Sequence, residues 1–140
     1  TYGPRTLVVG DAAGMAKPTS GGGVYTGVRA ARHAAAVAVE CCRKGSFGEQ
    51  DLARYEELWK ADVGRELSLG MALHRARREL SPAEVDAILA AFRDPEIVEE
   101  IVKYGDMDRP SALFRRLALK PRVIRAAGIL LRGTLRAFLT

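Results

Sequence analysis

Cysteine and long apolar runs are both scarce in this sequence of 140 residues, and each scarcity excludes a class of protein. The two cysteines, Cys41 and Cys42, are adjacent and lack the two-residue spacer of a redox or zinc-binding motif. We interpret them as small buried residues or free thiols, and we predict no metal site. No run of 18 apolar residues is present, so the sequence predicts no membrane-spanning helix.

Acidic residues are absent from the last thirty positions, which hold seven Lys and Arg residues. The first 110 residues hold 15 basic and 17 acidic residues, so the net charge of +5 arises from the tail. Aromatic residues do not alternate with this basic run, as they do in proteins that bind single-stranded nucleic acid. Nucleic acid is therefore not an expected partner.

The stretch from Thr6 to Tyr25, TLVVGDAAGMAKPTSGGGVY, organises the rest of the chain. Its apolar run Leu7, Val8, Val9 predicts a strand that is buried on both faces in a parallel sheet. Asp11 follows at the carboxyl edge of that sheet, where open α/β folds bind ligands.

Three glycines, Gly21, Gly22 and Gly23, precede a long helical pattern. Without Cβ atoms they let a flat or charged group approach the backbone N–H groups that open the helix, where negative charge is favoured. Together with the carboxylate of Asp11, this arrangement suits a ligand with a polyol and an anionic end. The alternative is a flexible loop capped by Thr19 or Ser20.

No later segment supplies a partner for the strand, and the sequence starts without Met. Because a lone parallel strand cannot satisfy its own ladder, we expect the chain to be the C-terminal portion of a larger protein.

The segment VVGDAAGMAKPTSGGGVYTGVRAARHAA resembles the second FAD motif of the flavoprotein superfamily that includes aromatic hydroxylases and geranylgeranyl reductases. The resemblance implies that Asp11 holds the ribityl chain of FAD. It also implies that Gly21, Gly22, Gly23 and Val24 lie against the isoalloxazine ring. Hydroxylases of the superfamily often have His where this chain has Gly14, so the resemblance favours the reductases.

The pattern from Val24 to about Lys44 predicts a helix with a close-packing face of small residues. That predicted face consists of Val28, Ala31, Ala35, Ala38 and Cys42. We interpret His33 as a solvent-facing or core histidine, because no acid or second histidine is placed to make it part of a site.

A second helix is predicted from Glu49 or Gln50 to about Leu80. Its apolar stripe has spacings of three and four and consists of Leu52, Tyr55, Trp59, Val63 and Leu67. The stripe packs on the first domain, or alternatively Trp59 binds substrate by lining a cavity for a long hydrocarbon. Short helices are predicted at 82–93 and 95–104.

The segments LARYEELWKADVGRELSLG and YGDMDRPSALFRRL are similar to the C-terminal region of archaeal-type geranylgeranyl reductases. We therefore expect a mainly α chain with one N-terminal strand, as part of an α/β FAD-binding flavoprotein of the glutathione-reductase type. Residues 1–48 would end the FAD-binding domain, and residues 49–140 would form a C-terminal helical region with a basic tail.

The resemblance implies FAD-dependent hydrogenation of isoprenoid double bonds in membrane lipid precursors, as in archaeal ether lipids. An isoprenoid lipid is then the substrate, and a reduced nicotinamide or ferredoxin-type protein is the electron donor. We predict no catalytic residue within this chain, a cytoplasmic location, and no activity of the chain alone. The alternatives are a quinone side-chain reductase, a hydroxylase, or a non-enzymatic helical interaction module. The last expects residues 1–23 to be disordered or to pair with a partner protein.

The tail from about Lys120 predicts a basic amphipathic helix. Its basic side consists of Arg122, Arg125, Arg132 and Arg136, and its apolar side of Ile124, Ala127, Leu131, Leu135 and Phe138. Such a helix suits contact with an anionic membrane surface through residues 120–140, on the cytoplasmic face. The alternative is a terminal helix docked on its own protein.

Overall fold

A computed structural model describes residues 1–139 as mainly helical, with one short hairpin at the N-terminus. The expected mainly α fold is confirmed. The chain divides into two compact units, Thr1–Ser68 and Leu69–Thr140. These units are defined by packing, whereas the predicted boundary at residue 48 separates an FAD-binding part from a helical region. That boundary stays a prediction.

The N-terminal strand is not the buried parallel strand that the apolar run predicts. Strand β2, Thr6–Leu7, pairs antiparallel with β1, Tyr2–Gly3, in the register Tyr2↔Leu7 and Gly3↔Thr6. The sequence offers no partner strand downstream, but the partner, β1, begins four residues upstream of β2. Beyond Leu7, the N–H of Val8 donates to the carbonyl of Thr1 at 2.8 Å, and the carbonyl of Val8 accepts a hydrogen bond from the Tyr55 hydroxyl at 2.8 Å.

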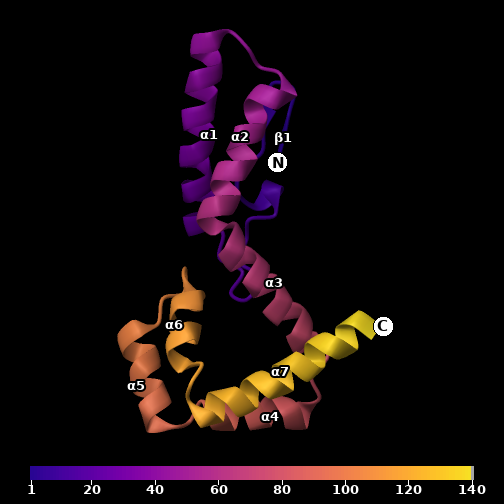
Figure 1. The fold of residues 1–140 in the computed structure, drawn as a ribbon, viewed down its shortest axis with the longest axis vertical. Helices are drawn as coiled ribbons and strands as arrows, with labels where there is room; N and C mark the ends of the chain where they lie inside the picture. The colour runs from indigo at the N-terminus through magenta and orange to yellow at the C-terminus, as the bar shows by residue number, and fades with distance from the viewer. Residues whose placement is uncertain (140) are drawn as a thin grey trace. The chain divides into compact units, whose positions relative to one another are not determined.

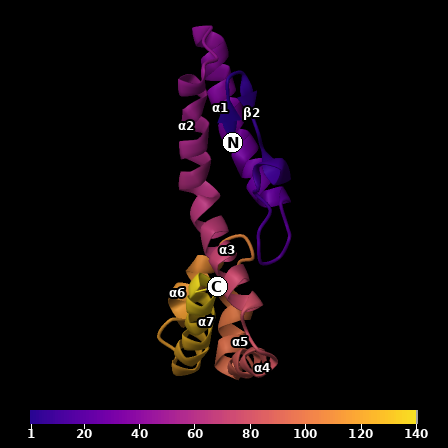
Figure 2. The same ribbon diagram turned by 90° about the vertical axis from the view of Figure 1, so that its right-hand side faces the viewer.

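Helix α1, Val24–Lys44, packs along helix α2, Glu49–Trp59, and the hairpin lies against them (Figures 1 and 2). The predicted packing face of α1 is wrong in this structure, since Val28 is 65 % exposed. The buried face lies one position earlier along the chain and consists of Thr26, Ala30, Ala34, Val37 and Cys41. Small apolar residues occupy both faces of α1, so spacing alone could not choose between them.

The second predicted helix is confirmed in extent but contains a wide turn. After α2, residues Lys60–Gly64 form a π-helical turn, η2, and α3 continues over Arg65–Arg78. The apolar stripe is confirmed, because Leu52, Tyr55, Trp59 and Val63 are all buried in the core of the first unit.

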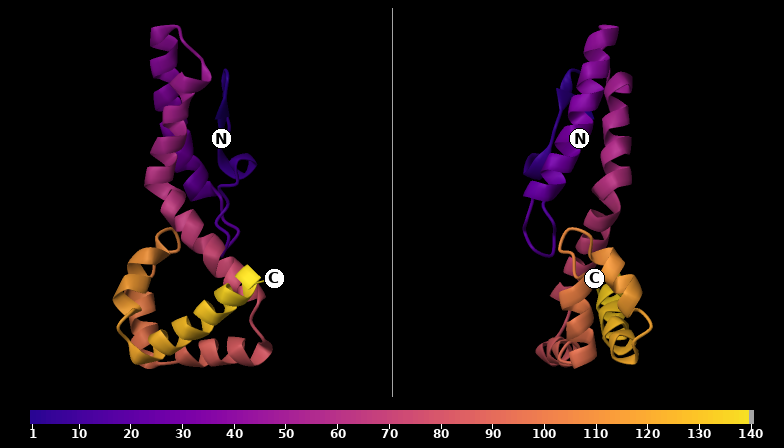
Figure 3. Two further views of the ribbon diagram at one scale, coloured as in Figure 1. Left: turned by 45° about the vertical axis from the view of Figure 1, so that its right-hand side comes forward. Right: turned by 90° about the vertical axis from the view of Figure 1, so that its left-hand side faces the viewer.

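The second unit contains α4 (Pro82–Ala91), α5 (Pro95–Tyr104), α6 (Pro110–Leu117) and α7 (Pro121–Leu139), as Figure 3 shows. The predicted starts of α4 and α5 are confirmed, since Ser81 and Asp94 accept hydrogen bonds from backbone N–H groups in the first turns of these helices. A small core forms where α5, α6 and α7 meet, around Ile97, Leu117 and Val123.

Helix α7 packs on α4, and its buried residues Val123, Ala126 and Ile129 form a stripe that the sequence pattern did not single out. The predicted apolar side is exposed instead, with Ile124, Leu131 and Leu135 at 54 %, 62 % and 56 %. The side chains of Arg136 and Phe138 lie outside the described residues. Of the helices described up to Leu139, none is long and apolar enough to span a membrane.

Candidate functional site

The loop between β2 and α1 is anchored at both ends. Gly10 has a φ of +71°, which favours glycine, and opens a short 3-10 turn, η1 (Gly10–Ala13). Its carbonyl accepts from the N–H of Met15 at 3.1 Å, and Met15 is fully buried. The hydroxyl of Thr26 in α1 lies 2.5 Å from the carbonyl oxygen of Met15. The loop therefore has one defined path across α1.

The glycine-rich segment closes on itself ahead of α1. The N–H of Lys17 donates to the carbonyl of Gly22 at 2.9 Å, and the N–H of Gly21 donates to the carbonyl of Lys17 at 2.8 Å. Gly21 has a φ of +73°, which favours glycine. A Cβ added to Gly22 would lie 3.2 Å from Cε of Lys17, so this side chain folds over the glycine. The sequence interpretation did not include Lys17, whose aliphatic chain covers the loop.

The carboxylate of Asp11 lies at the start of α1. Gly23 is the N-cap residue of this 21-residue helix, and no side chain among the described residues caps it. A Cβ added to Gly23 would overlap the Asp11 carboxylate, so glycine is required for this approach. Asp11 itself is exposed. The site thus offers an acceptor for hydroxyl groups beside open backbone N–H groups, and this combination fits a ligand with a polyol and an anionic end.

The structure brings together Asp11, Gly21, Gly22 and Gly23, and Val24 follows at the first helical position with 82 % exposure. Their roles toward a cofactor stay predictions. Trp59 lies elsewhere, in the core of the first unit, with 9 % exposure and its indole N–H donating to the Thr1 hydroxyl at 2.8 Å. This placement matches the packing alternative for the stripe, and substrate contact by Trp59 stays a prediction.

The Tyr-Glu-x-x-Trp segment of α2 now has a physical role. Tyr55 is fully buried and its hydroxyl reaches Val8, while Trp59 reaches Thr1. Burial, followed by the nearby Glu56 carboxylate, raises the pKa of the Tyr55 hydroxyl, so it remains a donor at neutral pH. These two bonds tie α2 to the segment that leads into the glycine loop.

A charged cluster joins α1 to the π-helical turn. Arg29 donates two hydrogen bonds to Asp62, at 2.8 and 2.7 Å, and Nε2 of His33 lies 2.9 Å from the same carboxylate. The Arg29 hydrogen bonds hold the pKa of Asp62 down at about 2, against the opposing effect of burial. The expectation that no acid accompanies His33 is therefore wrong. The spacing of four residues shows that Arg29 and His33 lie on the same face of α1. No sequence pattern indicates that their common partner, Asp62, lies 29 residues after His33 in a π turn.

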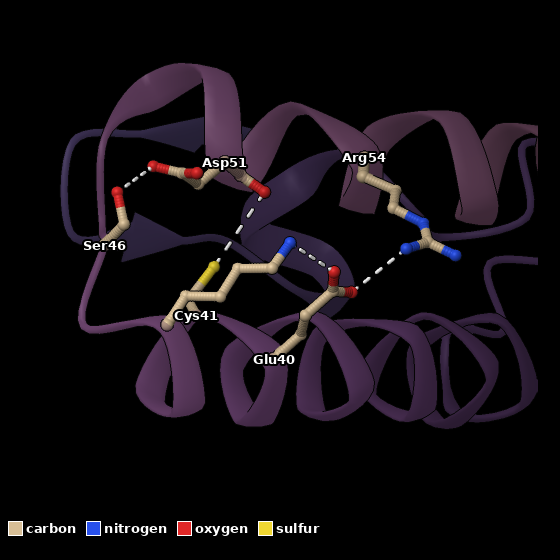
Figure 4. Close-up of polar contacts among 6 residues, drawn as sticks. Glu40, Cys41, Ser46, Asp51 and Arg54 are labelled. Carbon is tan, nitrogen blue, oxygen red and sulfur yellow. Dashed lines mark hydrogen bonds and ion pairs between the residues drawn. The ribbon is translucent and has the colours of Figure 1, made fainter.

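Polar contacts also fix the far end of α1, where it turns into α2 (Figure 4). Glu40 pairs with Lys44 at 2.6 Å and with Arg54 at 3.0 Å, and Ser46 donates to Asp51 at 2.6 Å. These groups are exposed, so each pair contributes little to stability. Cys41 is buried and Cys42 is exposed, both as free thiols, and burial raises the pKa of Cys41. These contacts hold the connection between α1 and α2 in place.

The Tyr-Gly-Asp loop of the second unit is organised by its own side chains. Asp106 accepts hydrogen bonds from the N–H groups of Asp108 at 2.7 Å and Arg109 at 3.2 Å, which forms a tight turn before α6. The guanidinium of Arg116 lies 3.6 Å from the centre of the Tyr104 ring. The motif therefore shapes the junction between α5 and α6.

Comparison with known proteins gives several archaeal relatives. The chain is 34 % identical over 113 residues to digeranylgeranylglycerophospholipid reductase 1 of Methanothermobacter thermautotrophicus, which covers 78 % of this chain and 28 % of the relative. It is 28 % identical over 129 residues to digeranylgeranylglycerophospholipid reductase of Methanosphaerula palustris, covering 86 % of this chain and 31 % of the relative.

The chain is a homologue of archaeal digeranylgeranylglycerophospholipid reductases. A third relative, reductase 2 of Methanopyrus kandleri, is 32 % identical over 108 residues, 74 % of this chain and 27 % of that protein. The chain thus spans less than a third of the length of each of these three reductases. No protein-family profile and no solved structure matches it. The resemblance stated from the motifs is confirmed at the level of homology.

Proposed function

We propose that this chain supplies the flavin-holding loop and a helical region of an FAD-dependent reductase that hydrogenates isoprenoid double bonds of membrane lipid precursors. The homology to enzymes named as digeranylgeranylglycerophospholipid reductases supports the reaction class. The observation that supports FAD as the cofactor is the position of the Asp11 carboxylate beside Gly23, at the uncapped start of α1.

In this proposal Asp11 accepts hydrogen bonds from the ribityl hydroxyl groups, and the N–H groups that follow Gly23 face the anionic edge of the ring. The glycines keep side chains out of that space, and the bonds from Tyr55 and Trp59 hold the loop in register. FAD, when bound, supplies hydride to the substrate double bond. A reduced nicotinamide or a ferredoxin-type protein would supply the electrons that reduce the flavin. No described residue is assigned the proton transfer.

The cofactor role is tested by Asp11→Asn in the protein as its gene encodes it. A hydrogen bond to a charged acceptor is worth roughly 1.5–3 kcal/mol, so we expect FAD to bind about ten- to a hundredfold more weakly. Asp86→Asn, an exposed acid on α4, is the matched control and should leave the affinity unchanged. A wild-type protein that purifies without the visible flavin spectrum, or equal affinity in wild type and Asp11→Asn, would refute the proposal.

The interaction-module alternative expects residues 1–23 to be disordered or to pair with a partner protein. In the structure these residues pack on α1 and α2 within the chain, through Met15, Tyr55 and Trp59. A hydroxylase or a quinone side-chain reductase would use the same flavin loop. Product analysis with isoprenoid lipid, quinone and aromatic substrates separates these three activities.

A second proposal concerns location: a cytoplasmic protein that touches the membrane surface through α7. The exposed apolar stripe of Ile124, Leu131 and Leu135 supports it, together with exposed Arg125 and Arg132 nearby on the same helix. We expect flotation with anionic liposomes that weakens with salt, at about 1 kcal/mol per cation near the surface. The double variant Ile124→Ser/Leu135→Ser should lose flotation.

The matched control for the membrane test is Val102→Ser, since Val102 is 81 % exposed on α5 and outside α7. Flotation that ignores salt and persists in the α7 double variant would rule out this contact.

A further inference from the structure

The second unit contains an apolar cavity of about 280 Å³ that plays no part in the flavin loop. Its walls come from α3, α6 and α7, with Phe92 at the end of α4. Among the described residues, the lining side chains are all hydrocarbon and include Leu69, Ala72, Leu73, Phe114, Val123 and Ala127. Such walls offer no side-chain hydrogen bond, so a phosphate, a sugar or a peptide backbone would lose its water without replacement. An apolar ligand would instead remove the apolar walls and its own apolar surface from water, which is favourable.

The cavity is continuous with the exposed stripe of α7. Leu131 lines the cavity and is also 62 % exposed, and on the same helix Ile124 and Leu135 are 54 % and 56 % exposed. Leu131 therefore connects the cavity with the exposed apolar residues of α7. A closed core cavity would have no such connection.

Size limits the occupant. A volume of about 280 Å³ lies at the lower end of the roughly 300–1,000 Å³ of small-molecule pockets, so the cavity holds a segment of a long chain rather than a whole lipid. A polar head group would remain outside, because none of the described residues that line the walls is polar.

We propose that this cavity between α3, α6 and α7 binds the hydrocarbon end of the isoprenoid chain, which enters along the exposed stripe of α7. The proposal rests on the proposed reductase function for the identity of the chain. It assigns Ala72, Leu73 and Ala127 as residues that set how much of the chain is held.

The probe is geraniol, a ten-carbon isoprenoid alcohol, with binding measured by titration calorimetry. Ala127→Phe and Ala72→Trp place bulk into the cavity from α7 and α3, and both alanines are exposed, so the fold should tolerate them. A single methylene in an apolar pocket changes binding by roughly 10–200-fold, so we expect each variant to weaken geraniol at least about tenfold. Ala87→Phe, at an exposed alanine of α4 that does not line the cavity, should bind like wild type. Circular dichroism identifies a variant that fails to fold. In that case, geraniol binding by the other variant tests the proposal.

Surface adsorption is the main rival to cavity binding. Leu135→Ser removes an exposed apolar side chain of α7 that does not line the cavity. Geraniol binding that falls in Leu135→Ser but persists in both cavity variants would overturn the proposal. A dimer that excludes geraniol would overturn it as well, because a second copy would then cover the cavity.

The two proposals fail separately. A protein that binds FAD but whose geraniol affinity is unchanged by Ala127→Phe and Ala72→Trp retains the proposed function and loses this site. A protein without FAD whose geraniol binding is blocked by these variants retains the site and loses the proposed function.

Discussion

Replacing Asp62 by asparagine should loosen the first unit by an amount that depends on pH. The pKa of Asp62 falls from an ordinary 3.8 to about 2 because Arg29 and His33 bind its carboxylate, and the side chain is only 12 % exposed. That difference corresponds to about 2 kcal/mol of stability when the carboxylate is ionised. Asparagine keeps the shape and removes the charge, so we expect the variant to lose about that much at pH 7.

The sign of the pH dependence follows from the lowered pKa. The stabilisation is fully present above pH 3.8, where the unfolded chain also carries the charge, and is lost as the pH falls toward about 2. The gap between wild type and Asp62→Asn should therefore close as the pH falls from about 4 toward 2.

The assay is urea unfolding of the 140-residue chain followed by tryptophan fluorescence. Trp59 is the only tryptophan and lies in the core of the first unit, so its signal reports that unit alone. Glu57→Gln, an exposed acid on α2, is the control and should shift the unfolding midpoint little. Equal midpoints for wild type and Asp62→Asn at pH 7 would refute the role of the cluster, as would a gap that stays open at pH 2.

Three further changes test other contacts. Gly23→Ala should push the Asp11 carboxylate away from the start of α1 and weaken FAD binding in the protein as its gene encodes it, whereas Gly3→Ala, which meets no atom within 4 Å, should not. Tyr55→Phe leaves the Val8 carbonyl without its donor and should cost about 1–3 kcal/mol by Trp59 fluorescence; an unchanged midpoint contradicts this. Ser81→Ala removes the N-cap of α4 and should cost about 1 kcal/mol, seen as faster amide exchange in α4 with α1 unaffected.

Local signals in the sequence predict the helix ends of this chain well. Ser81 before Pro82 and Asp94 before Pro95 each mark a helix start through a single side chain and its neighbours, and both lie where predicted. The α2 stripe is equally clear, because large apolar residues recur on only one face. The glycine loop also lies beside Asp11 as its chemistry suggests.

Choices between two similar faces are not predictable in this way. On α1 small apolar residues surround the helix, and on α7 the stripe of Val123, Ala126 and Ile129 competes with a second stripe containing Leu131. Which one is buried depends on the partner helix. The Arg29–Asp62 pair was missed because it joins residues 33 positions apart. The strand differed because pairing depends on a two-residue segment too short to carry a pattern.

The wide turn at Lys60–Gly64 has a consequence for how this stretch can vary among relatives. A π turn holds one residue more than an α turn, so this stretch contains one residue that a continuous α-helix would not need. Removing a single residue there would restore an ordinary turn and leave the stripe of Tyr55, Trp59 and Val63 facing inward. A relative that lacks the residue equivalent to Asp62 should therefore retain the buried face but have no acid opposite Arg29.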